Sequence, residues 1–293
     1  MKLTAQTKIQ ADLDTVWRYT QTPELHRRWD LRFTDIEFLN ENGSNGSKRF
    51  RYATRIGFGR TIEGWGETIG ASDRQTSVLR FGSDDPKSLI SEGAGSWTYK
   101  PTASGIDFST IYDYSVRYGI LGRCFDSLVF RPLMIWATRW SFDRMRLWIE
   151  QGTPPEVALR MWISKLACRT MLGLVWIHEG IVPKVVFVTP DELALVARPG
   201  LYWPDPRTTL AILGAAEALF GIWIISGRQE RLTATLSILA IIILSFLVVA
   251  VRPELLIDPI GGISKNLGLV ACSLIVLLLA GVSPTAKQAK QDL

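Results

Sequence analysis

An uncharged, apolar run from Leu232 to Val251 constrains this chain more than any other feature of its 293 residues. As a helix, a run of about 20 residues crosses the hydrocarbon core of a bilayer, which is about 30 Å thick. Similar runs occur at 208–226, where Glu217 is the only charge, and at 266–283. Because three such runs with polar flanks are unusual in one soluble domain, the chain from about residue 160 onward is predicted to be an integral membrane bundle.

A fourth, kinked span is predicted at 165–188. Before it, Thr153-Pro154-Pro155-Glu156 has the form of a capping box with proline at the first helical position. Pro183 should kink or break the helix, because proline cannot donate a backbone hydrogen bond. Thr189-Pro190-Asp191-Glu192 repeats the capping pattern, which predicts a short helix outside the bilayer that ends at Pro199-Gly200.

Four spans would place both termini on one side of the membrane. The placement of Lys and Arg weakly favours the cytoplasmic side for them, and the first residues lack the apolar core of a signal peptide. We therefore expect both termini in the cytoplasm and the spans in a bacterial-type cytoplasmic membrane.

Composition narrows the classes of ligand. The net charge is +5, without a basic tract interleaved with aromatic residues, so a nucleic-acid partner is not expected. The three cysteines are far apart and form no Cys/His cluster, so neither a metal site nor a disulfide framework is expected. Self-association into a homo-oligomer is left open.

Few polar side chains fall within the predicted spans, and a charge there is costly unless it is paired or faces a cavity. A membrane polar site is predicted from His178, Glu179, Lys184, Glu217 and Asn266. Two interpretations stay open. These residues could bind a quinone headgroup or relay protons, or they could form a structural ion pair and reach water at the interface.

Three segments in the membrane half carry a family resemblance. Residues 176–184 read WIHEGIVPK, residues 214–221 read GAAEALFG, and Asp258-Pro259 is followed by Lys265-Asn266-Leu267. Together they resemble DoxX-like small membrane proteins over about 160–285. The resemblance implies a four-helix membrane unit, with quinone-linked oxidoreductase chemistry in some relatives. Thiol chemistry is doubtful here, because the chain has no paired-cysteine motif.

The first half predicts one antiparallel, curved sheet. After a strand at 3–9 and two short helices, runs of strand type are separated by turn signals, at 33–40, 48–58, 60–70, 75–82, 88–100 and 105–117. A long helix follows at about 124–150. Its apolar stripe should pack across the sheet and consists of Leu133, Trp136, Ala137, Trp140 and Leu147.

This order of elements, with the opening segment from Ile9 through Asp14-Thr15-Val16-Trp17 to Trp29-Asp30, resembles the START-like (SRPBCC) superfamily. The resemblance implies an α+β helix-grip fold over residues 1–152, in which a curved antiparallel sheet wraps a long C-terminal helix around a cavity for an apolar ligand. An all-α, four-helix transmembrane bundle would occupy 153–293.

Aromatic and hydroxyl side chains are the candidates for lining such a cavity. Alternation along the last strand places four of them on one face, and two tryptophans could face the same space: Phe108, Thr110, Tyr112, Tyr114, Trp65 and Trp97. The alternative is ordinary core packing. Arg49, Arg51 and Arg55 alternate on one strand, where they could meet an anionic ligand or lipid headgroups or simply form the solvated face of the sheet, which is the favoured interpretation. His26 is interpreted as part of a solvated helix face.

No catalytic constellation is apparent, so enzymatic activity is left undecided. The leading interpretation is a membrane-anchored protein whose cytoplasmic domain binds a hydrophobic or amphipathic, lipid-like molecule. The alternative is a DoxX-like redox protein that binds a quinone, with a regulatory soluble domain.

Overall fold

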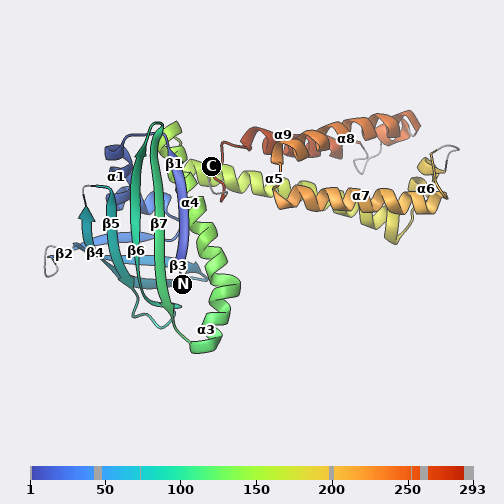
Figure 1. Ribbon diagram of the computed structural model, residues 1–293. Helices are drawn as coiled ribbons and strands as arrows, with labels where there is room; N and C mark the ends of the chain where they lie inside the picture. The colour runs from blue at the N-terminus through green and yellow to red at the C-terminus, as the bar shows by residue number, and fades with distance from the viewer. Residues whose placement is uncertain are drawn as a thin grey trace. The chain divides into compact units, whose positions relative to one another are not determined.

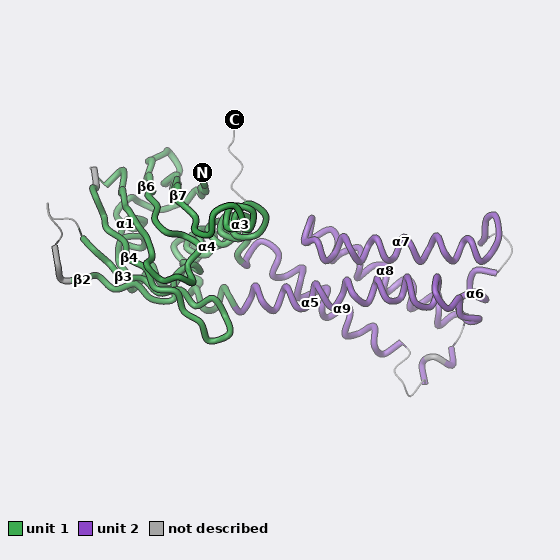
Figure 2. The backbone as a smooth tube through the Cα atoms, turned by 90° about the horizontal axis from the view of Figure 1, so that it is seen from below, with its two compact units in different colours: residues 1–159, 284–293 green, residues 160–283 purple. Residues whose placement is uncertain are grey.

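The computed structural model describes residues 2–42, 48–72, 74–197, 201–251, 253–257 and 263–286. Contacts divide the chain into two compact units (Figure 2), residues 1–159 with 284–293 and residues 160–283. The division falls inside one helix, a little beyond the predicted boundary at 152. The predicted helix end at Pro199-Gly200 and the Asp258-Pro259 segment lie outside the described residues.

Seven antiparallel strands form the sheet of the first unit, in the order β1-β7-β6-β5-β4-β3-β2 (Figure 1). Their bounds lie close to the predicted runs: β1 Lys2–Ile9, β2 Asp35–Asn42, β3 Lys48–Gly57, β4 Arg60–Ser72, β5 Thr76–Gly82, β6 Ile90–Thr102 and β7 Gly105–Val116. Along β7 every second residue from Ile106 to Tyr114 is buried, because successive side chains of a strand point to opposite faces.

Two short helices connect β1 to β2. Asp12 caps α1 (Leu13–Gln21) by accepting from Thr15 N at 2.7 Å, and Pro23 opens α2 (Pro23–Trp29). After β7, the chain stays helical through α3 (Gly119–Phe125), one π-helical turn η1 (Asp126–Phe130) and α4 (Arg131–Gln151). Gly152, in the left-handed region at φ +66°, ends α4. The sheet and the long helix make the predicted helix-grip fold.

Aromatic side chains fill the core between the sheet and α4. Phe142 lies 4.7 Å from Phe108 and 6.2 Å from Trp29, measured between ring centroids. The predicted stripe is wrong at Leu133, whose side chain is 55% exposed. Its neighbour Met134 packs against the core instead. Residues three or four positions apart lie on the same side of a helix, and the side of α4 that faces the sheet carries Met134, Thr138, Phe142 and Met145.

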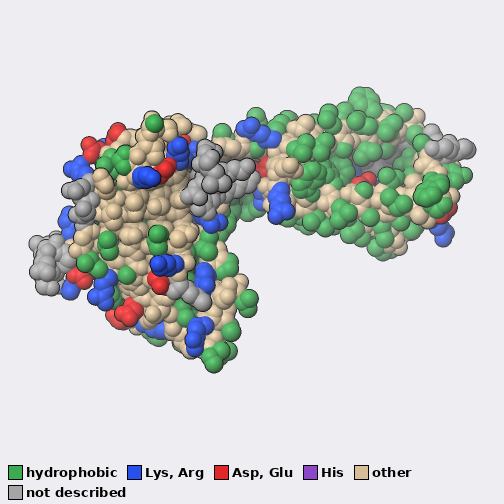
Figure 3. All heavy atoms as spheres, in the orientation of Figure 1, with side chains coloured by type: hydrophobic (Ala, Val, Ile, Leu, Met, Phe, Trp, Pro, Cys, Tyr) green, Lys and Arg blue, Asp and Glu red, His purple; other side chains and the backbone are tan. Residues whose placement is uncertain are grey.

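The second unit is helical. Its elements are α5 (Pro155–Ile181), which begins in the first unit, a π-helical turn η2 (Val182–Val186), α6 (Pro190–Val196), α7 (Pro206–Ser226), α8 (Glu230–Val251), a 3₁₀ turn η3 (Pro253–Leu256) and α9 (Lys265–Leu279). Apolar side chains cover much of the visible surface of this unit (Figure 3).

Length and composition identify α7 and α8 as helices able to cross a membrane, as predicted. The helix from Pro155 to Val186, together with α6, which is bent from it by 91°, passes the same test as a pair. The apolar α9 has 15 residues, so at 1.5 Å per residue it is about 22 Å long. This length is shorter than the predicted span at 266–283.

Pro183 was predicted to kink or break the helix, and it does not break it. It lies in the π-helical turn η2, where the wider turn accommodates a ring that would clash with the carbonyl four residues earlier. Phe187 N closes this turn by donating to Val182 O at 3.0 Å. The sharp bend therefore comes after η2, before Pro190.

Paired glycines allow α5 and α7 to approach closely. Gly173 faces Gly221 and Gly180 faces Gly214, so the two helices cross in antiparallel directions. A Cβ atom at Gly173 would lie 2.7 Å from Gly221 O, and one at Gly214 would overlap with Gly180 O. Small residues at such contacts are the usual means of close helix packing in membranes.

We expect Gly214→Ala to destabilise the second unit by about 1–3 kcal/mol, because the added methyl group overlaps with backbone of α5. The matched control is Gly268→Ala in α9, where a Cβ meets nothing within 4 Å. There the better helix propensity of alanine should stabilise by about 0.5–1 kcal/mol. Thermal unfolding of the purified chain in detergent, followed by circular dichroism, measures both. If both substitutions change the melting temperature in the same direction, the close contact between α5 and α7 at Gly214 is contradicted.

Candidate functional site

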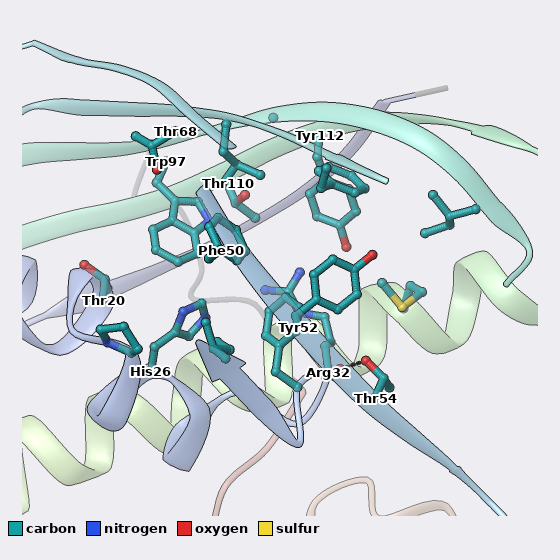
Figure 4. A pocket seen from close by; sticks show the side chains of 18 of the residues that line it. Thr20, His26, Arg32, Phe50, Tyr52, Thr54, Thr68, Trp97, Thr110 and Tyr112 are labelled. Atoms are coloured by element: carbon teal, nitrogen blue, oxygen red, sulfur yellow. Dashed lines mark hydrogen bonds between the residues drawn. The ribbon is translucent and has the colours of Figure 1, made fainter. Parts of the chain in front are cut away.

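A cavity of about 230 Å³ lies in the first unit, bordered by the concave side of the sheet, α2 and the segment that leads into α4. Its walls are mostly apolar and aromatic (Figure 4). They come mainly from strands β2 to β7 and from α1, α2, η1 and α4, and include Phe33, Phe50, Ile62, Leu79, Phe81, Trp97, Phe130 and Met134. Polar groups are few and come mainly from threonine, serine, His26 and Arg32.

Three of the predicted residues, Trp97, Thr110 and Tyr112, line this cavity together. Trp97 and Thr110 are direct partners across β6 and β7, so they stand side by side on the same face. The Tyr112 hydroxyl shares a hydrogen bond of 3.0 Å with Thr138 Oγ1 on α4, which holds its ring against the helix.

Phe108 and Tyr114 share that face of β7 but lie outside the cavity lining. Phe108 is fully buried in the core beside it, 5.1 Å from the Tyr99 ring. Tyr114 donates its hydroxyl to Asp126 Oδ1 at 2.6 Å, at the turn where α3 passes into α4. Phe108 and Tyr114 are therefore packed in the core, which was the alternative interpretation.

Trp65 does not face the cavity. Its neighbours Gly64 and Gly66 lie on the cavity side of β4, where the rings of Tyr52 and Phe50 occupy the space that a Cβ atom would fill. Alternation then turns Trp65 to the opposite face, where it is 36% exposed. The glycines on either side made the position of this tryptophan hard to infer, because they weaken the usual polar alternation.

A buried charged cluster that the sequence analysis missed borders the cavity, which its members Arg32 and His26 line. Arg32 binds Asp30 in a two-point fork, Nε to Oδ1 at 2.9 Å and Nη2 to Oδ2 at 2.7 Å. His26 Nε2 lies 3.0 Å from Asp30 Oδ2. Burial opposes ionisation of Asp30, but the charge and hydrogen bonds of Arg32, with the bond to His26, hold the pKa of Asp30 well below its usual range.

Neighbouring elements hold this cluster in place. Asp30 caps the end of α2, where its N–H donates to His26 O at 3.1 Å. The next residue, Leu31, donates its N–H to Ser141 Oγ of α4 at 2.8 Å, and Arg32 O accepts from Thr54 Oγ1 of β3 at 2.7 Å (Figure 4). The segment 30–32 therefore links α2, α4 and β3.

The prediction that His26 lies on a solvated helix face is wrong. Its side chain is 13% exposed, stacked on Trp29 at 4.7 Å and edge-on to Trp97 at 5.1 Å. The spacing of His26 and Asp30, one helical turn apart, was the available signal. The residues around it, Arg27 and Arg28, do face solvent and pair with Asp35 and Glu156.

Strand β3 separates its two kinds of side chain as alternation requires. Arg49 and Arg51 lie on the outer face, where they pair across strands with Glu67 and Glu63. Phe50 and Tyr52 point into the cavity from the other face (Figure 4). Burial raises the pKa of Tyr52 to about 12, and its hydroxyl donates to Gly82 O at 3.2 Å.

In the second unit, Lys184 is the centre of the predicted membrane polar site. Its side chain is 10% exposed, and Nζ lies 2.9 Å from Glu217 Oε2 and 3.4 Å from Glu192 Oε1. Nζ also donates to the carbonyl of Glu179 at 3.0 Å. Lys184 and Glu217 thus form a paired group, which satisfies the requirement for a charge in a membrane helix.

The other predicted members are arranged separately. Glu179 Oε1 pairs with Lys265 Nζ at 3.1 Å and lies 3.9 Å from His178 Nδ1. Asn266 donates to Ser245 Oγ on α8 at 2.8 Å. His178, Glu179 and Lys265 border a shallow pocket of about 340 Å³ whose apolar residues are Leu174, Val175 and Leu269. Across the described ranges, no three His, Cys, Asp or Glu side chains converge as a metal site would need.

Comparison with known proteins defines the class of the second unit. Residues 173–274 match the sequence model of the DoxX-like family, as the resemblance predicted. The two long apolar helices fall in the same region. The chain is therefore a membrane protein with a DoxX-like part.

A curated relative is the uncharacterized membrane protein YndG of Bacillus subtilis (strain 168). It is 45% identical over 178 residues, which are 59% of this chain and 66% of that protein. The match spans slightly less than two thirds of the relative's length.

Solved structures with a similar fold are remote in sequence. The di-domain ARO/CYC StfQ of the steffimycin biosynthetic pathway is 14% identical, with a TM-score of 0.40, over 52% of this chain and 51% of that one. The protein of unknown function SA2116 from Staphylococcus aureus is 13% identical, with a TM-score of 0.40, over 52% of this chain and 95% of that one.

We expect Asp30→Asn to destabilise the first unit by about 3–5 kcal/mol at neutral pH, because the buried Arg32 loses its counter-ion. The pKa of Asp30 is lower in the folded chain than the value of about 3.9 in the unfolded one. The stability that ionised Asp30 contributes is thus complete above about pH 5 and decreases as the pH falls through 4 toward the folded pKa. The difference in free energy of unfolding between wild type and Asp30→Asn should therefore become smaller in that range.

Urea unfolding followed by tryptophan fluorescence at several pH values measures this gap. The control is Asp35→Asn, which removes an exposed partner of Arg27 and should change stability by less than about 1 kcal/mol. Equal effects of the two substitutions, or a gap that is independent of pH, would contradict the assigned role of Asp30.

Proposed function

We propose that this protein is a membrane-anchored binding protein whose first unit holds a hydrophobic or amphipathic, lipid-like small molecule in the cavity of the helix-grip fold. The observation that carries the proposal is the cavity of about 230 Å³ beside a densely packed aromatic core. Protein interiors contain few voids larger than a water molecule, so a space of this size is more simply explained as a ligand site than as a packing defect.

The chemistry of the walls supports this class of ligand. Aromatic and aliphatic side chains cover most of the lining, whereas Arg32, His26 and a few hydroxyl groups supply isolated polar contacts. Binding sites for small molecules combine an apolar surface with a small number of placed polar groups in this way. A ligand with one polar end and an apolar body would match both.

The membrane part fits the same proposal. Lipid-like molecules dissolve in the hydrocarbon core of a bilayer, because their apolar surface is unfavourable in water. Anchoring by α7 and α8 would keep the binding unit close to that reservoir. We propose that both termini, and with them the binding unit, are cytoplasmic.

Filling the cavity should abolish ligand retention. Leu79 lines the cavity from β5, and Leu79→Trp adds a large ring to that space. The control, Arg80→Trp, adds the same ring one residue along, on the exposed face of the strand. The full chain, purified in mild detergent, is analysed by native mass spectrometry. We expect a small apolar molecule with wild type and Arg80→Trp, and at least about tenfold less with Leu79→Trp.

The interpretation fails if wild-type protein carries no such molecule and binds no added lipid-like probe. It also fails if Leu79→Trp is folded and still retains the ligand, because the cavity would then not be the site.

We propose quinone binding by the second unit as a second candidate function, on the basis of the shallow pocket beside His178, Glu179 and Lys265. Quinone carbonyl oxygens accept hydrogen bonds, and Lys265 Nζ and a histidine N–H donate them. The apolar side chains Leu174, Val175 and Leu269 would contact the ring and tail. The paired charges of Lys184 and Glu217 lie outside this pocket and are proposed to be structural.

Calorimetric titration of a short-chain ubiquinone into the chain in lipid nanodiscs tests this candidate. We expect Lys265→Met to weaken binding roughly tenfold, since a hydrogen bond to a charged group contributes about 1.5–3 kcal/mol. Arg207→Met, which removes an exposed charge at the start of α7, should leave it unchanged. Absence of binding above that of empty nanodiscs would exclude the pocket as a quinone site.

A further inference from the structure

Resting on the proposed function of the cavity, we propose that its ligand is an acidic amphiphile whose carboxylate is bound by Arg32. The apolar body of the ligand would lie along Phe50, Leu79 and Trp97. The inference is carried by one juxtaposition: the mostly buried guanidinium of Arg32 lines a cavity whose walls are mainly apolar.

The donor groups of Arg32 point to an acceptor in the cavity. A guanidinium has five N–H donors and no acceptor. The fork to Asp30 uses Nε and Nη2, so the N–H groups on Nη1 are outside that fork. Figure 4 shows Arg32 reaching into the cavity beside Tyr52 and Tyr112. A carboxylate oxygen placed there would accept from a guanidinium N–H and bring the opposite charge.

The surroundings of Arg32 offer aromatic faces in place of water. Its Cζ lies 5.5 Å from the Phe33 ring centroid and 5.7 Å from that of Tyr112. The Tyr52 hydroxyl donates to Gly82 O, and the Tyr112 hydroxyl is bonded to Thr138 Oγ1 and also interacts with Arg32. In such a poorly solvated place, a charge-assisted hydrogen bond to a ligand is stronger than it would be in water.

The local charge favours an anion over a neutral or cationic head. Arg144 is a second buried guanidinium, 7% exposed, and it interacts electrostatically with Glu156 and, less strongly, with Asp30. Its Nε donates to Pro155 O at 2.9 Å, and it makes no ion pair in the part of the chain described. Taken together, the two carboxylates Asp30 and Glu156 and the three guanidinium groups Arg28, Arg32 and Arg144 carry one net positive charge.

An amine head would be disfavoured by the same arrangement. A cation beside Arg32 would be repelled, and it would have to compete for Asp30, both of whose oxygens already accept from Arg32. An alcohol can accept one hydrogen bond but brings no charge. The expected order of affinity for heads on one chain length is therefore carboxylate, then alcohol, then amine.

Three probes of equal chain length test the inference: decanoate, decanol and decylamine. The full chain is first stripped of copurified ligand and then placed in nanodiscs. Each probe is titrated into it calorimetrically, with empty nanodiscs as the blank. A hydrogen bond to a charged group contributes about 1.5–3 kcal/mol, so decanoate should bind roughly 10- to 100-fold more tightly than decanol. Decylamine should bind most weakly.

The decisive variant removes the charges but keeps the volume. In Asp30→Leu/Arg32→Met, both members of the buried pair become apolar, a change that folded proteins often tolerate. We expect it to bind decanol as before and to lose the preference for decanoate. Arg32→Lys retains a charge without the fork and should reduce the preference. Arg49→Met, on the outer face of β3, should leave it unchanged. Circular dichroism checks that every variant is folded.

The outcomes separate this inference from the proposed function. Equal binding of decanoate and decanol by wild type, or an unchanged preference in the folded double variant, would overturn the role of Arg32 and leave a cavity for apolar ligands. If wild type binds none of the three probes above the blank, the proposed binding function itself is overturned.

Discussion

The buried fork between Asp30 and Arg32 is the interaction on which the first unit depends. Removing two charges from water is unfavourable by several kcal/mol per ion, and the pair is tolerated only when its geometry is good and its remaining donors and acceptors are satisfied. Here both carboxylate oxygens are used, and the backbone around the pair is bonded to α4 and β3. The segment between the short helices and the sheet is thereby held in one conformation.

The cavity exists because large and small residues face each other across the sheet. Phe50 and Tyr52 project over Gly66 and Gly64, so two aromatic rings rest on bare backbone of the neighbouring strand. Because the rings lie flat against the concave face, they do not fill the space between the sheet and the helices, and the cavity remains. Arg32 and His26 of the charged cluster line that space, and Met134 of α4 forms part of its wall.

Much of this architecture could be predicted from the sequence, since alternation and turn residues locate strands within a few residues. The same rules failed where a neighbour decides the outcome. Leu133 and Met134 are both apolar, so only the packing of α4 shows which one turns inward. Trp65 lies between glycines that remove the pattern from its strand. His26 is polar and beside arginines, and its burial depends on Trp29 of its own helix and on Trp97 of β6.

The first unit contains more of the chain than its fold would suggest, and this affects where the chain can be cut. Pro155–Leu159, at the start of α5, belong to it: Glu156 pairs with Arg28, and Ala158 is fully buried. From the far end, Thr285 N donates to Asp143 Oδ2 at 2.8 Å. A fragment that stops at residue 152 would uncover Arg144 and lose both attachments, so a domain boundary chosen from the fold alone would truncate the folded unit.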